Sequence, residues 1–249
     1  MIEICCGSYE DALNAARGGA KRIELNSALY MGGLTPTEAC LSLVLRDTDL
    51  KVICMVRPRG AGFYYTEAEK VQMFAEAKML LAQGCHGIAF GFLTAEAEID
   101  EEATEKMVAL IHQYGGEAVY HRAFDCVNDP DATMKVLIAL GVDRVLTSGQ
   151  AEKAMQGKEL IRTLQQRYGE QIELLAGSGV NASNAQELMA YTGITQVHSS
   201  CKDWQIDPTT TGAQVSYAFA SAPHERCYDI VDKHLVKKLE VSVYEKARE

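Results

Sequence analysis

One short pattern recurs along most of this sequence: an apolar run, a capped amphipathic stretch, a glycine, and a further apolar run. It predicts strands at residues 2–6, 21–26, 51–57, 86–91, 117–121, 143–147, 172–176 and 195–199. Several of these runs are almost continuously apolar, as parallel strands buried on both faces should be. Eight strand-and-helix units in 249 residues predict an α/β fold, a single (β/α)8 TIM-like barrel.

Helix starts and the absence of a linker support a single domain. Residues 35–38 and 66–69 read as capping boxes, and Ser8 begins a looser version. An open doubly wound sheet uses the same units, but it requires a glycine-rich dinucleotide turn that residues 5–9 lack. We therefore expect a barrel over about 1–201 and a C-terminal helical tail over 202–249, with an amphipathic helix from about 224.

Charge and cysteine content narrow the possible partners and compartment. The formal net charge of −10 argues against nucleic acid and anionic membranes as partners. The N-terminus lacks a basic segment, so no signal peptide is predicted, and a cytoplasmic protein is expected. The eight cysteines are then expected to remain thiols, and without Cys-x-x-Cys or His-x-x-x-His spacing a structural zinc site is not predicted.

Polar residues at alternating strand positions are predicted to converge inside the barrel. Side chains alternate along a strand, so the apolar faces of the predicted strands turn the intervening polar residues towards the axis. Buried charges are costly unless they are paired, hydrogen-bonded or in contact with a ligand. Most of these residues fall near strand C-termini, where barrel active sites lie. The inward set is Glu3, Glu24, Arg57, His121 and His198.

Three loops add anion-binding chemistry. Arg57 and Arg59 lie in a proline- and glycine-containing loop, and their guanidinium groups suit carboxylate or phosphate. The loops after the seventh and eighth strands commonly bind phosphate in this fold. Here those loops contain Gly177, Ser178, Gly179, Ser199 and Ser200.

These residues are compatible with two kinds of site. As an enzyme, the chain could move protons with Glu24 and His121 and hold an anionic group with Arg57. The predicted catalytic set is Glu24, Arg57, His121, Arg122 and His198. Alternatively, the glutamates and histidines could bind a divalent metal or simply form ion pairs.

Several segments resemble the CutC family of copper homeostasis proteins. They occur in the family order over about residues 3–200: 3–6, 22–25, 32–36, 57–60, 121–125, 146–150 and 197–200. The resemblance implies a cytoplasmic TIM-like barrel, usually a homo-oligomer, with a dimer as the first expectation. It also implies a role in copper tolerance, with Cys5 and Cys6 at the positions suggested for copper. The chain departs from the family pattern at residues 60–63 and at Cys201, which is predicted near the mouth.

Copper and catalysis would use different residues. Cu(I) favours thiolates that are brought together, whereas adjacent strand residues such as Cys5 and Cys6 point to opposite faces unless the strand ends between them. Our hypothesis is a copper homeostasis protein that binds Cu(I) through Cys5 and Cys6, with no organic cofactor. The first alternative is an acid–base enzyme acting on a small phosphorylated or carboxylated metabolite. The second alternative is a non-catalytic scaffold.

Overall fold

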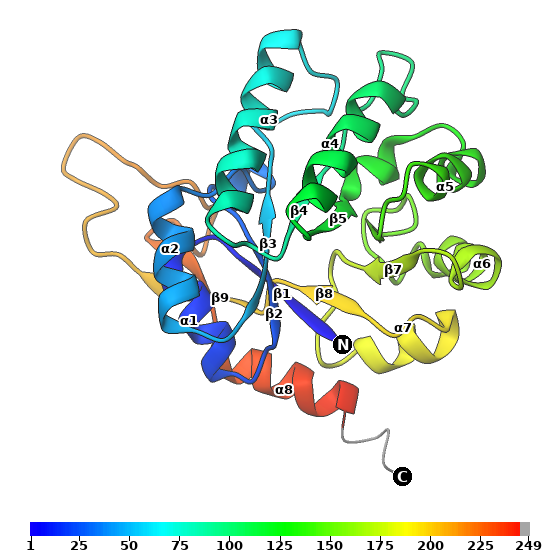
Figure 1. The fold of residues 1–249 in the computed structure, drawn as a ribbon. Helices are drawn as coiled ribbons and strands as arrows, with labels where there is room; N and C mark the ends of the chain where they lie inside the picture. Colours follow the sequence, from blue (N-terminus) through cyan, green and yellow to red (C-terminus); the bar gives the residue numbers. More distant parts are fainter. Residues whose placement is uncertain (245–249) are drawn as a thin grey trace.

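The computed structural model, described here over residues 1–244, is a closed barrel of eight parallel strands (Figure 1). Each strand pairs with its sequence neighbour, and the first pairs with the eighth, so the predicted TIM-like fold is confirmed. All eight expected strands are present, and every strand after the first is one or two residues shorter than predicted. The strands are β1 (Ile2–Cys6), β2 (Arg22–Leu25), β3 (Lys51–Met55), β4 (Gly87–Phe90), β5 (Glu117–Tyr120), β6 (Arg144–Thr147), β7 (Glu173–Ala176) and β8 (Val197–Ser199).

Helices surround the barrel and begin at recognisable caps. Ser8 and Thr66 cap the helices that follow them, as predicted. The second helix instead begins at Glu38 with Thr37 as its cap, because the Thr35 hydroxyl binds Glu76 Oε2 and the Arg57 carbonyl. The helices are α1 (Tyr9–Arg17), α2 (Glu38–Asp47), α3 (Glu67–Ala82), α4 (Glu101–Gln113), α5 (Pro130–Ala139), α6 (Lys158–Tyr168) and α7 (Ala185–Thr192), with 3-10 turns η1 (Leu29–Met31) and η2 (Arg122–Cys126).

The main apolar core lies between the strands and the helices, and a second, small apolar cluster lies inside the barrel. That inner cluster consists of Ile53, Met55, Ala89 and Val119. Beneath the mouth the interior is charged, since Arg22 pairs with Glu3 at 2.6 Å and Arg144 with Glu173 at 2.7 Å. Arg22 and Arg144 are each only 2% exposed. Pairing keeps these buried charges tolerable.

The segment after β8 is not a simple helical tail. Antiparallel strands β9 (Lys202–Ile206) and β10 (Cys227–Val231) form a two-stranded sheet. The helix α8 (Lys233–Tyr244) therefore begins later than the predicted 224, because residues 227–231 pair with β9. Helix α8 packs between α7 and α1, in the position of the eighth barrel helix. Residues 245–249 of the predicted tail lie outside the described residues.

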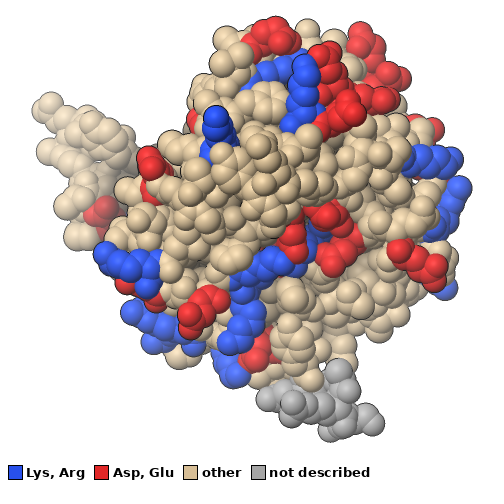
Figure 2. Space-filling view, viewed as in Figure 1, with Lys and Arg blue, Asp and Glu red and all other residues tan. Residues whose placement is uncertain are grey.

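The face of the molecule seen in Figure 2 is mixed in charge. Figure 2 shows basic and acidic side chains interspersed over the visible face, without one large patch of a single sign. The loop that joins β9 to β10 contains no charged residue from 208 to 223. Within residues 1–244, no helix is long and apolar enough to cross a membrane.

Candidate functional site

A cavity of about 540 Å³ opens at the C-terminal ends of the barrel strands. Its volume lies in the range of small-molecule pockets. Most of the residues predicted from the sequence as functional line it. These are Cys5, Glu24, Arg57, His121, Arg122, Ser178, Gly179, His198, Ser199 and Ser200. Cys6, Arg59 and Gly177 are not among the lining residues, and Glu3 lies beneath the cavity.

One wall of the cavity brings together a thiol, a carboxyl group and an imidazole. Donor atoms of Cys5, Glu24 and His198 all lie within 4.8 Å of one another, and we call these residues the Cys–Glu–His cluster. They come from β1, β2 and β8, which are neighbours because the barrel closes between β1 and β8. A thiolate, an imidazole and a carboxylate are all metal ligands, so the donor set fits a transition metal.

Glu3 positions the imidazole of this cluster. Its carboxylate lies 2.8 Å from Nδ1 of His198 and 2.6 Å from Nε of Arg22. The contact with Nδ1 leaves Nε2 of His198 on the side of Cys5, where it could bind a metal once its proton is displaced, as in metal sites where a carboxylate orients a histidine. Burial by itself would raise the pKa of Glu3. The hydrogen bond with His198 and the charge of Arg22 outweigh it and lower the pKa of Glu3 to about 2. Hydrogen bonds with Cys5 and Glu3 outweigh burial and raise the pKa of His198 well above its ordinary value.

Burial disfavours the charged forms of the other two members of the cluster. Burial is the main cause that raises the pKa of Cys5 to about 12, and it also raises the pKa of Glu24. Asn26 Nδ2 donates to Glu24 Oε2 at 2.9 Å and lies 3.6 Å from Cys5 Sγ. A metal that binds Cys5 must therefore displace the thiol proton, which makes the metal affinity depend on pH.

The other predicted cysteine ligands do not reach the cluster. β1 continues through Cys6, so Cys5 and Cys6 lie on opposite faces of the strand. Cys6 is fully buried in the apolar layer beneath the helices, where its Sγ contacts the Ile4 carbonyl at 3.7 Å. Cys201 is also packed in that layer, and its Sγ contacts Ser199 Oγ at 3.6 Å. The structure therefore brings Cys5 alone, of these three, to the cavity.

The opposite wall contains Arg57 and His121. Arg57 is 5% exposed, and its terminal nitrogens donate to the carbonyls of Met31, Gly33 and Ala61. His121 is 3% exposed and caps η2, where its Nδ1 accepts from the Ala123 N–H at 3.1 Å. Burial, followed by the charge of Arg57, lowers the pKa of His121 to about 3, so the ring is neutral at physiological pH.

Arg59 points away from the cavity, although it lies in the same loop as Arg57. Its Nε pairs with Glu69 Oε1 at 2.5 Å, at the start of α3. Its remaining donors bind the carbonyls of Gly60, Gly62 and Tyr64, and the guanidinium lies over the Tyr65 ring. Arg59 thus closes the loop against α3.

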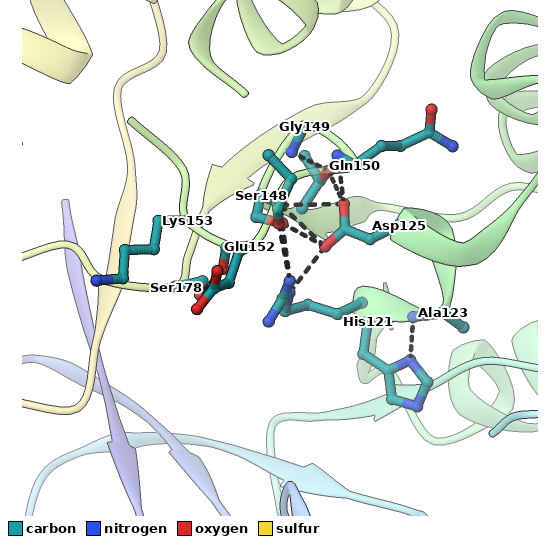
Figure 3. Close-up of polar contacts among 12 residues, drawn as sticks. His121, Ala123, Asp125, Ser148, Gly149, Gln150, Glu152, Lys153 and Ser178 are labelled. Atoms are coloured by element: carbon teal, nitrogen blue, oxygen red, sulfur yellow. Dashed lines mark hydrogen bonds and ion pairs between the residues drawn. The ribbon is translucent and has the colours of Figure 1, made fainter. Parts of the chain in front are cut away.

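Asp125 is a central residue that the sequence interpretation left out of the site. It pairs with Arg122 at 2.7 Å and accepts a hydrogen bond from Thr147. It also accepts hydrogen bonds from Ser148 and Gln150 (Figure 3). It therefore joins the segments 121–125 and 146–150, and fixes Arg122 at the cavity edge. The sequence signal that could have identified Asp125 is its position three residues after Arg122, which lies just beyond the end of β5.

Ser178 and Ser199 of the last two loops line the cavity but use their hydroxyls locally. Ser178 Oγ donates to the Glu152 carbonyl at 2.6 Å, and Ser199 Oγ donates to the Val180 carbonyl at 2.6 Å. Ser178 and Gly179 both have positive φ, at 76° and 71°. Gly177 lies behind them, where a Cβ would come within 2.7 Å of Leu146.

Fold and site together define a (β/α)8 barrel protein with a thiol–imidazole–carboxyl cluster at the mouth. The model of the CutC family matches residues 1–203, and the chain belongs to that family. A CutC family protein of Treponema denticola is 40% identical over 92% of this chain and 93% of its own length. A mouse protein named as a copper homeostasis protein cutC homolog is 39% identical over 81% of this chain and 74% of its own length.

A solved structure supports the same assignment. The crystal structure of a CutC protein from Streptococcus agalactiae matches with a TM-score of 0.75 at 28% identity. The match covers 80% of this chain and 98% of that one. The resemblance inferred from the sequence motifs is therefore confirmed, and the family-level link is to proteins named for copper homeostasis.

Proposed function

We propose that this protein takes part in copper homeostasis by binding one Cu(I) ion at the Cys–Glu–His cluster. The observation that carries the proposal is the convergence of Cys5, Glu24 and His198 donor atoms within 4.8 Å at the mouth of the barrel. The names of the family relatives support copper as the metal.

Ligand chemistry assigns the roles. Cu(I) is a soft ion that prefers thiolate, and imidazole also suits copper, so Cys5 Sγ and His198 Nε2 would be its ligands. The Glu24 carboxylate is a harder donor and would act mainly by balancing charge, with Asn26 holding it in place. Cys6 is not part of this site, because its side chain lies on the other face of β1.

Further parts of the proposal concern compartment and assembly. All eight cysteines are free thiols, which suits a reducing cytoplasm where Cu(I) is the stable copper state. A homo-oligomer, first of all a dimer, is the expected assembly, and light scattering at several protein concentrations would test it.

The test is an anaerobic Cu(I) competition titration of the reduced protein against a calibrated chelator, with Zn(II) titrated in parallel. We expect one tight Cu(I) equivalent per chain that is lost in Cys5→Ser and strongly weakened in His198→Gln. Cys126→Ser is the matched control, because Cys126 is an exposed thiol that belongs to no cluster of potential metal ligands in residues 1–244.

Three results would contradict the proposal. The first is failure of the wild-type protein to compete for Cu(I), and the second is a Cys5→Ser variant that competes as well as wild type. The third is a higher affinity for Zn(II) than for Cu(I), when both affinities are calculated for the free metal ions. Failure to compete would favour the other hypotheses, a scaffold or an acid–base enzyme, and turnover assays on phosphorylated and carboxylated metabolites would separate those two.

A further inference from the structure

The wall of the cavity opposite the Cys–Glu–His cluster has features that metal binding does not use. Arg57 and His121 both line the cavity and are both more than nine-tenths buried. They flank one aromatic ring, with the Arg57 guanidinium 5.2 Å and the His121 ring 4.9 Å from the centre of Phe63. Neither residue is an attractive neighbour for a copper ion, because one is a fixed cation and the other has its free ring nitrogen protonated.

The charge of Arg57 is uncompensated. Among residues 1–244, no carboxylate lies within ion-pair distance of its guanidinium, in contrast to the paired arginines Arg22 and Arg144 lower in the barrel. Its three carbonyl partners fix the loops before α2 and α3 but supply no full negative charge. The neighbouring Tyr65 hydroxyl interacts with the guanidinium, but burial raises the pKa of Tyr65, so it supplies no negative charge. A buried guanidinium in this state calls for an anion.

His121 supplies a matching neutral donor. Its Nδ1 accepts from the Ala123 N–H, which assigns the ring proton to Nε2. That Nε2 is buried and has no partner within the described residues. A buried N–H without an acceptor is rare in a folded protein unless a ligand satisfies it.

Two glycines keep this arrangement possible. A Cβ at Gly91 would lie 2.6 Å from Cε1 of His121, so any side chain there would displace the ring. A Cβ at Gly32, where φ is +91°, would lie 3.0 Å from Nη1 of Arg57. Both donors are thus held by close-fitting surroundings at one wall of a cavity large enough for a small molecule.

We propose that Arg57 and the Nε2–H of His121 form an oxyanion subsite that binds the carboxylate or phosphate group of a small molecule in the mouth of the barrel. The guanidinium supplies the charge and the imidazole a fixed donor, and Phe63 packs against both. The proposal is independent of copper, since it uses none of the residues of the Cys–Glu–His cluster.

The test is calorimetric titration of the metal-free protein with inorganic phosphate and, separately, with malonate, at ionic strength held constant with sodium chloride. We expect saturable binding of at least one probe at one site per chain, and the preferred probe distinguishes a phosphate ligand from a carboxylate ligand. His121→Asn is the main variant, because an asparagine side-chain oxygen can still cap η2 while the Nε2 donor is lost. It should weaken binding by about tenfold to a hundredfold.

Arg57→Gln and Arg59→Gln form the matched pair. They remove one positive charge each from the same loop, but only Arg57 lines the cavity. Arg57→Gln should abolish binding, and Arg59→Gln should leave it unchanged. If Arg57→Gln does not fold, His121→Asn decides the question by itself.

The proposal is overturned if neither probe binds to the wild-type protein, if His121→Asn binds as tightly as wild type, or if Arg59→Gln loses binding as His121→Asn does. A Cu(I) titration of His121→Asn separates this proposal from the copper proposal. It should match the wild-type titration, whatever the result with phosphate and malonate.

Discussion

Replacing Glu3 by glutamine tests how the charged interior supports both stability and the site. Glu3 is 2% exposed and contacts Arg22 at 2.6 Å and His198 at 2.8 Å. Its pKa is lowered from 4.5 to about 2, because its partners outweigh the cost of burial. Since one pKa unit corresponds to about 1.4 kcal/mol, ionised Glu3 contributes about 3 kcal/mol to the folded state.

The sign of the pH dependence follows from that lowered pKa. The contribution is fully present above the unfolded-state pKa of 4.5 and is lost as pH falls towards the folded-state value of about 2. Glu3→Gln should therefore lower the free energy of unfolding by about 3 kcal/mol near neutral pH. The gap between variant and wild type should stay constant down to about pH 5 and narrow below it.

Chemical denaturation at a series of pH values measures this gap, provided that two probes give coincident transitions. Glu102→Gln is the control, because Glu102 pairs with Lys106 on the exposed face of α4 and its loss should not be measurable. A second readout is Cu(I) affinity, which should fall by about tenfold to a hundredfold as His198 loses its orienting carboxylate. A Glu3→Gln variant as stable as wild type at neutral pH would refute the energetic reasoning.

Three further predictions follow from other parts of the site. Cu(I) affinity should rise across the neutral range by about tenfold per pH unit for each proton displaced, because the pKa of Cys5 is raised to about 12 and that of His198 lies well above its ordinary value; competition titrations that give a flat pH profile would exclude thiolate ligation. Gly91→Ala should displace the His121 ring and weaken phosphate or malonate binding, while the Cu(I) titration is unchanged; calorimetry that gives wild-type affinity for the oxyanion probe would show that the ring is not constrained. Asp125→Asn should lower the free energy of unfolding by about 2–3 kcal/mol, because several donors lose a charged acceptor; denaturation curves that coincide with wild type would contradict this role.

Local chemistry in the sequence determined the fold and the direction of several side chains. Apolar runs alternating with capped amphipathic stretches predicted eight strands in their observed order. Alternation along β2 predicted that Glu24 points inward, because the residues on either side of it are apolar. The same rule separated Cys5 from Cys6, and the structure adds that β1 does not end between them.

Only the tertiary structure decided which inward residues meet. Cys5 and His198 are distant in the sequence, and their distance depends on how β1 registers against β8 when the barrel closes. Arg57 and Arg59 have the same chemistry in one loop, yet packing against Phe63 and pairing with Glu69 send them in different directions. Alternation sets the face of a side chain within one strand, but register between distant strands and loop packing are non-local, so the sequence pattern alone does not specify them.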